Sequence, residues 1–266
     1  MAAAKLITSR DNVLAKRVKG LAQSSRERKK SGLALIEGAH LVAACIEKLG
    51  VPDTLIASES GMRRPEIAGL MAANAAHHAV FSDAVFQDAS MVETPAGILA
   101  LIRPPDARPV SARAKFCLLL EDIQDPGNLG ALLRSAAAAG CADVLLSPTC
   151  AFAWAPKVLR AGQGAHFNLN IVEGADLGAF VHAYHGASLA LTPRTETSLF
   201  TCDLTGPVAL LIGNEGAGLS GHLLDSANIR AKLPMPGGFE SLNAAAAGAI
   251  ALFEVVRQRG TAGRKR

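Results

Sequence analysis

Cysteine is scarce in this sequence and is not arranged as a disulfide or metal site. The five cysteines are odd in number, widely spaced and never form a C-x-x-C pair: Cys45, Cys117, Cys141, Cys150 and Cys202. This pattern argues against a disulfide framework and against a zinc knuckle. The zinc motif H-E-x-x-H is also missing, so we expect no metal site.

Long uncharged apolar runs are missing as well. The longest, Leu242 to Phe253, is followed by Glu254 and Arg257, and it is shorter than the roughly 18 residues that a membrane span needs. The first ten residues contain no apolar stretch like a signal-peptide core. We therefore expect a soluble, cytoplasmic protein that has no membrane partner.

Two common motifs of nucleotide-binding proteins and hydrolases are absent. The sequence contains neither G-x-x-x-x-G-K with a following Ser or Thr nor G-x-S-x-G, which removes the support for P-loop chemistry and for a serine-hydrolase elbow. Aromatic residues make up only 4% of the chain, too few for a base-stacking platform. If RNA binds, backbone and shape contacts should dominate.

What remains is the composition of a globular protein with two domains. The chain has 266 residues, of which 50% are hydrophobic and 19% charged, so a disordered or collagen-like chain is excluded. At about 150 residues per domain, this length predicts two units.

The positive charge is concentrated near the beginning of the chain. Residues 5–30 contain nine lysines and arginines against two acidic residues, a net charge of +7, whereas the whole chain carries +4. Such a cluster neutralises phosphates well and predicts a polyanionic partner, although a solvated helix face stays an alternative. The candidate RNA-binding residues are Arg10, Lys16, Arg17, Arg28, Lys29 and Lys30.

The first part of the chain alternates between predicted helices and strands. Ser9 can cap an amphipathic helix whose apolar positions include Val13 and Leu21. Strands predicted at 33–36, 54–57, 78–81 and 97–102 alternate with helices, which indicates a small α/β domain. The stretch from 103 to 113 contains three prolines and breaks every periodicity. We therefore expect a basic RNA-binding domain over 1–103, a linker over 104–114 and a second domain over 115–266.

The second domain repeats the alternation, with a sheet that we expect to be mostly parallel. Ligands bind such open sheets at the carboxyl ends of the strands, where loops rich in Gly, Asn and acidic residues stand here. Strands are predicted at 115–120, 142–146, 169–172, 188–191, 208–212 and 229–233, and helices at 129–139, 156–161 and 242–257.

The first of three notable loops leads into the helix at 129–139. It reads Glu121-Asp-Ile-Gln-Asp-Pro-Gly-Asn-Leu-Gly-Ala-Leu-Leu-Arg134, in which Pro126 and Gly127 predict a turn and Asn128 can cap the helix. Arg134 interrupts an otherwise apolar run and could reach a phosphate. The alternative is a plain cap at Asn128 and a surface arginine.

The second loop follows the strand at 208–212 and contains G-x-G-x-x-G from Gly216 to Gly221. With Glu240 downstream, it makes a nicotinamide-dinucleotide site, and hence an oxidoreductase, an alternative. However, Asn214 and Glu215 separate the strand from Gly216, and fewer than 50 residues follow Gly221.

The third loop runs from Leu233 to Asn243 and enters an alanine-rich helix, for which Ser241 is a natural N-cap. A capped core helix would explain the alanines, because small residues let helices pack closely. It does not explain the Gly-Gly pair or Asn243.

Together the three loops resemble the three motifs of the SpoU (TrmH-type) RNA ribose 2′-O-methyltransferases, in order. The matching stretches are 125–134, 212–219 and, for the third motif, Leu233-Pro-Met with Glu240-Ser-Leu-Asn243. Residues 5–100 resemble the family's substrate-binding domain, with Arg28-Lys-Lys-Ser-Gly, Ile36-Glu-Gly-Ala-His and Glu93-Thr-Pro-Ala-Gly-Ile. One departure is Gly162-Gln-Gly-Ala165, where the family usually has Ser-Met-Gly-Ala.

The resemblance implies a trefoil-knotted α/β methyltransferase domain that binds S-adenosylmethionine and works as a homodimer. The backbone at Gly213 and 233–235 would hold the adenine and ribose, the glycine allowing close approach. It implies catalytic roles for Arg134, Asn128, Glu215, Ser241 and Asn243, with Arg134 as phosphate clamp or base. It implies cofactor contacts from Thr192, Gly213, Asn214, Gly216, Leu233, Met235, Ser241 and Leu242.

The expected substrate is structured RNA, methylated on a ribose 2′-hydroxyl. Ribosomal RNA is preferred, because the separate first domain resembles that of family members that act on rRNA, and tRNA stays an alternative. A non-catalytic RNA-binding module is a further alternative, which the intact Asn128, Arg134, Glu215 and Asn243 disfavour.

Overall fold

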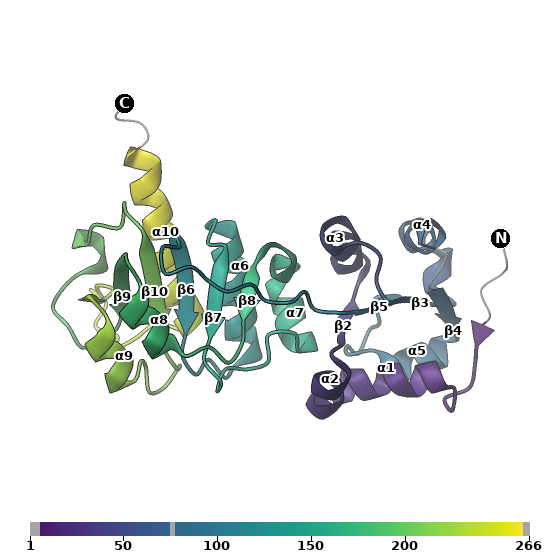
Figure 1. Ribbon diagram of the computed structural model, residues 1–266. Helices are drawn as coiled ribbons and strands as arrows, with labels where there is room; N and C mark the ends of the chain where they lie inside the picture. Colours follow the sequence, from purple (N-terminus) through teal and green to yellow (C-terminus); the bar gives the residue numbers. More distant parts are fainter. Residues whose placement is uncertain (1–5, 75–77, 263–266) are drawn as a thin grey trace. The chain divides into compact units, whose positions relative to one another are not determined.

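A computed structural model describes residues 6–74 and 78–262 (Figure 1). The chain divides into two compact units, one from the N-terminus to Asp106 with Trp154–Arg160, the other comprising Ala107–Ala153 and the chain from Ala161 onward. Each unit contains its own sheet and core.

The first unit is built on a five-stranded mixed sheet in the order β1-β4-β3-β5-β2. Strand β5 runs antiparallel to both β2 and β3, whereas β4 is parallel to β3 and β1. The elements are β1 (Leu6–Ile7), α1 (Val13–Gln23), α2 (Ser25–Ser31), β2 (Ala34–Glu37), α3 (Ala39–Leu49), β3 (Thr54–Ser58), η1 (Gly61–Arg63), α4 (Pro65–Ala73), β4 (His78–Phe81), α5 (Asp83–Ala89) and β5 (Ile98–Ile102).

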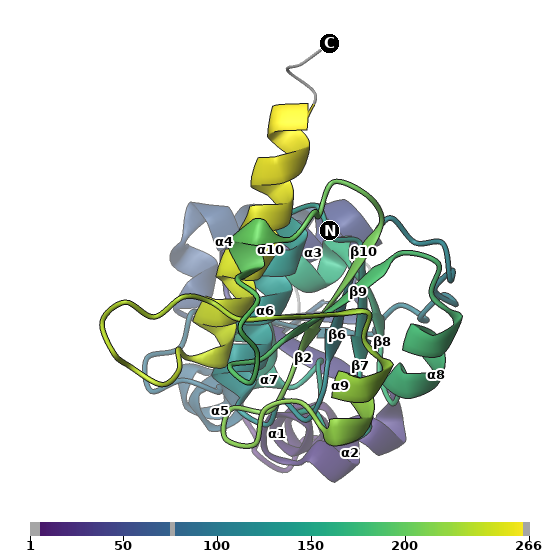
Figure 2. The ribbon, with the colours of Figure 1, turned by 90° about the vertical axis from the view of Figure 1, so that its left-hand side faces the viewer.

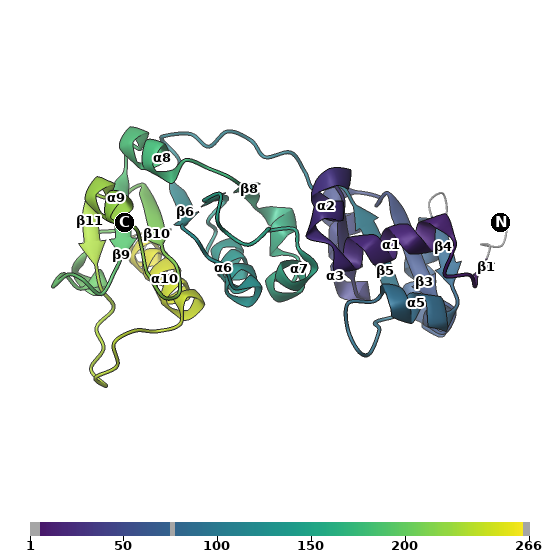
Figure 3. The ribbon, with the colours of Figure 1, turned by 90° about the horizontal axis from the view of Figure 1, so that it is seen from below.

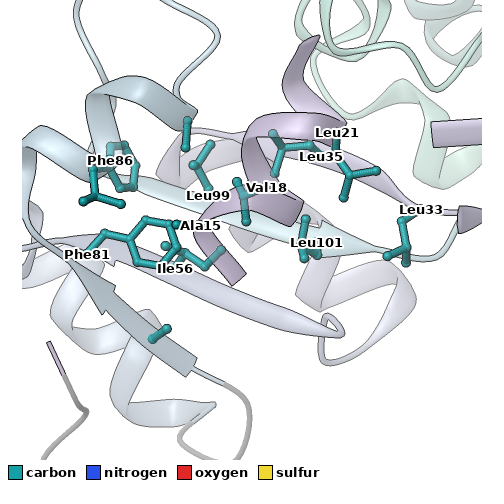
Figure 4. Packing of buried hydrophobic residues seen from close by; sticks show 13 residues of the cluster. Ala15, Val18, Leu21, Leu33, Leu35, Ile56, Phe81, Phe86, Leu99 and Leu101 are labelled. Atoms are coloured by element: carbon teal, nitrogen blue, oxygen red, sulfur yellow. The ribbon is translucent and has the colours of Figure 1, made fainter. Parts of the chain in front are cut away.

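One face of this sheet is covered by α1 and α5 (Figure 4). From α1, Ala15, Val18 and Leu21 pack on this face. They meet Phe81 of β4 and Phe86 of α5, both of which are fully buried. The spacing of three residues in α1 places its apolar side chains on one stripe and leaves its lysines and arginine outside.

Helix α1 begins three residues later than the sequence predicted. Its N-cap is Asn12, whose side chain accepts hydrogen bonds from the backbone N–H groups of Leu14 (2.9 Å) and Ala15 (3.4 Å). The predicted cap Ser9 instead accepts from the N–H of Asp11 (3.2 Å). The Ser9 prediction was therefore wrong, since asparagine is an equally good cap and stands next to the helix.

The second unit is built on a six-stranded sheet in the order β11-β9-β10-β6-β7-β8, and every pair in it is parallel. The remaining elements are, in chain order, β6 (Phe116–Leu120), α6 (Pro126–Ala138), β7 (Asp143–Leu146), α7 (Pro156–Gly162), η3 (Ala165–Asn168), β8 (Asn170–Val172), α8 (Leu177–Ala183), β9 (Ala187–Leu191), η4 (Leu199–Thr201), β10 (Val208–Ile212), α9 (Gly221–Ser226), β11 (Ile229–Ala231) and α10 (Ala244–Ala262). The α/β class with a parallel sheet is thus confirmed, while the trefoil knot stays a prediction.

The two faces of this sheet carry different helices (Figure 3). Along β10, Ala209 and Leu211 pack towards α8 and α9, so the alternate residues point to the other face. There α10 lies beside α6 (Figure 2). Gly248 permits this approach, because a Cβ at that position would overlap the side chain of Leu132.

The departure at 162–165 is explained by a buried histidine. The ring of His166 is fully buried, and its Nε2 donates to the carbonyl of Ala153 (2.9 Å). A Cβ at position 162 would lie 2.6 Å from the Cε1 of this ring. Gly162 therefore makes room for His166, and a serine there would have to displace it.

We expect the stability of the protein to fall as the pH drops from about 6.5 to about 4. Burial lowers the pKa of His166 from 6.5 to about 4, so in this window the unfolded chain binds a proton that the folded chain does not. The loss is about 3 kcal/mol. Denaturant unfolding of the wild type and of His166→Phe at a series of pH values measures this loss. The free energy of unfolding of the variant should not show this decrease. An equal decrease in both proteins would show that His166 is not its cause.

Candidate active site

Three loops meet at the carboxyl edge of the second sheet. They follow β6, β10 and β11, and they contain the three motif-like stretches of the sequence. Because all strands are parallel, the loops that follow neighbouring strands lie on the same edge.

A chain of hydrogen bonds joins one side chain from each loop. The Nδ2 of Asn243 donates to the Oδ1 of Asn128 (2.8 Å), and the Nδ2 of Asn128 donates to the Oε1 of Glu215 (3.0 Å). Residues separated by up to 115 positions are thus fixed side by side. These two hydrogen bonds fix the orientation of the side-chain amides of Asn243 and Asn128.

Glu215 is held as a carboxylate. Burial alone would raise its pKa, but the hydrogen bond from Asn128 and those from the backbone N–H groups of Asp125 (3.3 Å) and Gln124 (3.5 Å) outweigh burial and lower the pKa. A carboxylate with a lowered pKa is a weak base, so Glu215 is suited to orient Asn128 rather than to remove protons.

Both predicted helix caps at this edge were wrong. The cap of α6 is Asp125, which accepts from the N–H of Asn128 (2.8 Å), with Pro126 as the first helical residue. The cap of α10 is Asn243 rather than Ser241, because its Oδ1 accepts from the N–H groups of Ala245 (2.9 Å) and Ala246 (3.1 Å). Asn128 is consequently free for the contacts to Glu215 and Asn243.

The loop after β10 is closed upon itself. The backbones of Asn214 and Gly218 exchange two hydrogen bonds (3.1 and 3.0 Å). A Cβ at Gly213 would lie 2.5 Å from the carbonyl oxygen of Gly218. The glycine therefore serves the packing of the loop itself, and the close approach of a cofactor at Gly213 stays a prediction.

A cavity of about 450 Å³ opens between these loops, within the usual size range of small-molecule sites. All eight predicted cofactor residues line it, and so does Glu215. Which of them contact a cofactor stays a prediction. The eight are Thr192, Gly213, Asn214, Gly216, Leu233, Met235, Ser241 and Leu242.

Other lining residues were not predicted. They include Arg194 and Phe239, both exposed at the cavity. Arg194 stands three residues after the end of β9, so its place near a strand end would have been a usable signal. The side chain of Arg194 makes no hydrogen bond or ion pair to another described residue.

Arg134 is not part of the hydrogen-bonded cluster. It stands six residues after Asn128 in α6, which is about 120° around the helix and about 9 Å along it. Its side chain is exposed, does not line the cavity, and makes no hydrogen bond or ion pair within the described residues.

The predicted RNA-binding residues fall into three groups. Arg28 is only 8% exposed and donates to the carbonyl of Leu21 (2.6 Å) at the end of α1. We correct its assignment, because a buried arginine that caps a helix is structural. Arg10 and Lys16 are exposed but paired with Asp88 (2.6 Å) and Asp11 (2.8 Å). Arg17, Lys29 and Lys30 are exposed and make no ion pair within the described residues.

Within residues 6–74 and 78–262, no three His, Cys, Asp or Glu side chains are placed to hold a metal ion. In the same ranges, no helix is long and apolar enough to cross a membrane.

Two family models match the chain. The model described as the SpoU rRNA Methylase family covers residues 115–253, and the model described as the MRM3-like substrate binding domain covers residues 12–100. The dinucleotide-binding alternative loses its support, because residues 216–221 lie inside the first match.

Individual proteins agree with these models. The chain is 32% identical to the 23S rRNA (guanosine(2553)-2′-O)-methyltransferase RlmP of Bacillus subtilis, over 87% of this chain and 92% of that protein. The crystal structure of an RNA 2′-O ribose methyltransferase matches with a TM-score of 0.82 and 30% identity, covering 96% and 99% of the chains. AviRb of Streptomyces viridochromogenes in complex with AdoMet matches with a TM-score of 0.82 and 25% identity, covering 94% and 100%. The chain belongs to the SpoU rRNA methylase family.

Proposed function

We propose that this protein transfers a methyl group from S-adenosylmethionine to a ribose 2′-oxygen of ribosomal RNA. The observation that carries the proposal is the linked trio Asn243, Asn128 and Glu215, one from each motif loop, beside a cavity of suitable size. Membership of the SpoU family supports the reaction class, and the B. subtilis relative is a 23S rRNA enzyme.

The residues around the cavity fit S-adenosylmethionine. Leu233 and Met235 supply apolar walls, and their backbone N–H groups make no hydrogen bond to another described residue, so they can donate to a nucleoside. When bound, the cofactor supplies an electrophilic methyl group on a sulfonium. The carboxylate of Glu215 lines the same cavity and suits a positively charged ligand.

The ribose hydroxyl is a very weak acid, so the protein has to hold it in line and stabilise the charge that develops on its oxygen. We assign the placement to Asn128 and Asn243, which are already oriented, and to Ser241 at the cavity wall. A guanidinium is a poor base but binds phosphate oxygens bidentately, so we assign Arg134 the role of phosphate clamp and electrostatic stabiliser rather than base.

We propose domain boundaries at 1–103 for RNA docking, 104–114 for the linker and 115–266 for methyl transfer. The ranges of the two family models support this division. In the first domain, the exposed Arg17, Lys29 and Lys30 can neutralise RNA phosphates. The description of the first family model and the B. subtilis relative, a 23S rRNA enzyme, favour rRNA over tRNA.

We further propose a homodimer formed through α10 and α6. Ile250, Phe253 and Val256 leave a helical stripe of large apolar side chains exposed on α10, and the neighbouring α6 exposes Arg134. Such a stripe on a helix is typical of an interface. A second copy on it would bring Arg134 towards that copy's loops, and sedimentation equilibrium measures the association. The cytoplasmic location stays a prediction.

The proposal is tested by mixing the purified protein with methyl-labelled S-adenosylmethionine and bulk RNA that lacks the modification. We expect label in large rRNA that survives base hydrolysis as a 2′-O-methylated dinucleotide. Label in tRNA alone would replace the substrate, and label on a base would overturn the reaction class.

Asn243 donates a hydrogen bond to Asn128 and caps α10, and two substitutions distinguish these two roles. Asn243→Asp keeps an acceptor for the α10 N–H groups but cannot donate to Asn128, whereas Asn243→Ala loses both. We expect about tenfold weaker binding of S-adenosylmethionine in both variants, and about 1 kcal/mol of lost stability in Asn243→Ala alone. Calorimetric titration and denaturant unfolding measure the two effects. Normal cofactor affinity in the aspartate variant would show that the link to Asn128 is dispensable.

A further inference from the structure

We infer that Phe239 stacks on a nucleobase of the RNA at the mouth of the cavity, as a residue that positions the substrate. The inference rests on the proposed function and adds a contact to the base, which neither the basic cluster nor the cofactor cavity provides.

Phe239 is an unusual side chain for its place. It lines the cavity and is nevertheless 79% exposed. It stands on the loop between β11 and α10, directly after Gly237 and Gly238, of which Gly238 has a φ of +75°. This backbone lets the loop turn out, so the aromatic ring lies at the rim rather than in the core.

An exposed phenylalanine ring is not stabilised by contact with water, so its exposure beside a polar site points to a partner that covers it. Its flat face can stack on any base, which is worth about 1–3 kcal/mol per base and does not depend on the base's identity. Recognition of splayed RNA bases commonly uses such aromatic rings. Leu233 and Met235 line the same cavity and are less exposed than Phe239, so we assign the cofactor's apolar contacts to them and leave Phe239 to the RNA.

The distance to the polar trio suits the target nucleotide or a close neighbour. Phe239 precedes Asn243 by four residues, so their Cα atoms are at most about 14 Å apart even if the loop is extended. A stacked nucleic-acid strand rises about 3.4 Å per nucleotide and a splayed strand is more extended, so this distance spans at most about four nucleotides.

The negative charge of Glu240, next to Phe239, favours contact with a base over contact with the RNA backbone. Glu240 is exposed at the same cavity, and its carboxylate repels phosphates but can accept hydrogen bonds from the N–H groups of a base edge. A ring for the base face and a carboxylate for the base edge thus stand side by side in the sequence.

Phe200 provides a matched control. It is 51% exposed, lies on η4 of the same unit and does not line the cavity. We expect Phe239→Ala to lower kcat/KM for rRNA by about 5- to 150-fold, which is the stacking energy at about 1.4 kcal/mol per tenfold. Phe200→Ala should stay within about twofold, and Phe239→Trp should retain activity, because tryptophan keeps the stacking face.

A binding readout is independent of methyl transfer. Trp154, the only tryptophan, is buried, so the difference in fluorescence between Phe239→Trp and the wild type reports the surroundings of the new ring. We expect RNA, but not S-adenosylmethionine alone, to quench its fluorescence. Equal activity of Phe239→Ala and Phe200→Ala, a loss of cofactor affinity in Phe239→Ala, or dissociation of an oligomer in that variant would each overturn the inference. A wild type that methylates no RNA would overturn the proposed function instead.

Discussion

Replacing Arg134 by alanine should reduce methyl transfer by about 100- to 1000-fold and leave the binding of S-adenosylmethionine unchanged. Removal of one preorganised electrostatic stabiliser has an effect of this size in other enzymes. Cofactor binding should persist because Arg134 does not line the cavity and has no polar partner among the described residues. Single-turnover transfer and calorimetric titration measure the two quantities. Cofactor affinity that falls as much as transfer would contradict the assignment.

Arg134→Lys is the matched variant for this position. Lysine keeps the positive charge but not the planar, bidentate geometry of the guanidinium. If Arg134 clamps a phosphate, the lysine variant should recover part of the transfer. If the geometry alone matters, it should resemble alanine.

The position of Arg134 also predicts whether it acts in the active site of its own chain or in that of a second copy. It points about 120° away from Asn128 around α6, so we expect it to act in the site of a second copy. At S-adenosylmethionine concentrations well below the Kd of Asn243→Ala, mixing this variant with Arg134→Ala should then give more transfer than either variant alone, because one site of each mixed dimer carries both native residues. A mixture no more active than its components would place both residues in one chain's site.

The elements with long apolar runs could be predicted from the sequence. Strand β10 is found at Val208–Ile212, as expected, because buried parallel strands read as continuous apolar runs. Helices α5, α8 and α9 were missed. They have only six or seven residues, so a helical periodicity does not stand out, and they lack the first-turn proline that marks the equally short α7.

The site could be predicted only in part, because side chains of one type serve several purposes. Strand-end logic and the family motifs together led to the cavity residues, whereas the contacts of Asn128 and Asn243 depend on loops up to 115 residues apart. In the same way, the run Arg28-Lys29-Lys30 reads as uniformly basic. Only the fold shows that Arg28 turns inward to the end of α1.

Among substitutions of a glycine by alanine in the second unit, Gly213→Ala should be the most destabilising. The added Cβ would overlap backbone atoms of Gly218 and Leu219, not the movable end of a side chain, so the loop itself has to shift. Overpacking of this kind costs about 1–3 kcal/mol, or a Tm lower by about 2–12 °C for a unit of this size. The shift would move Glu215 away from Asn128, so cofactor affinity should fall about tenfold or more.

Gly216→Ala tests whether the effect comes from the overlap rather than from the loss of a glycine. At position 216 a Cβ would meet only the Oδ1 of Asn214 at 3.6 Å, an ordinary contact. Both substitutions add one methyl group to the same loop and reduce backbone freedom equally in the unfolded chain. We therefore expect Gly216→Ala to retain the wild-type Tm within about 2 °C. Equal losses of Tm in both variants would mean that the overlap at position 213 is not the cause of the destabilisation.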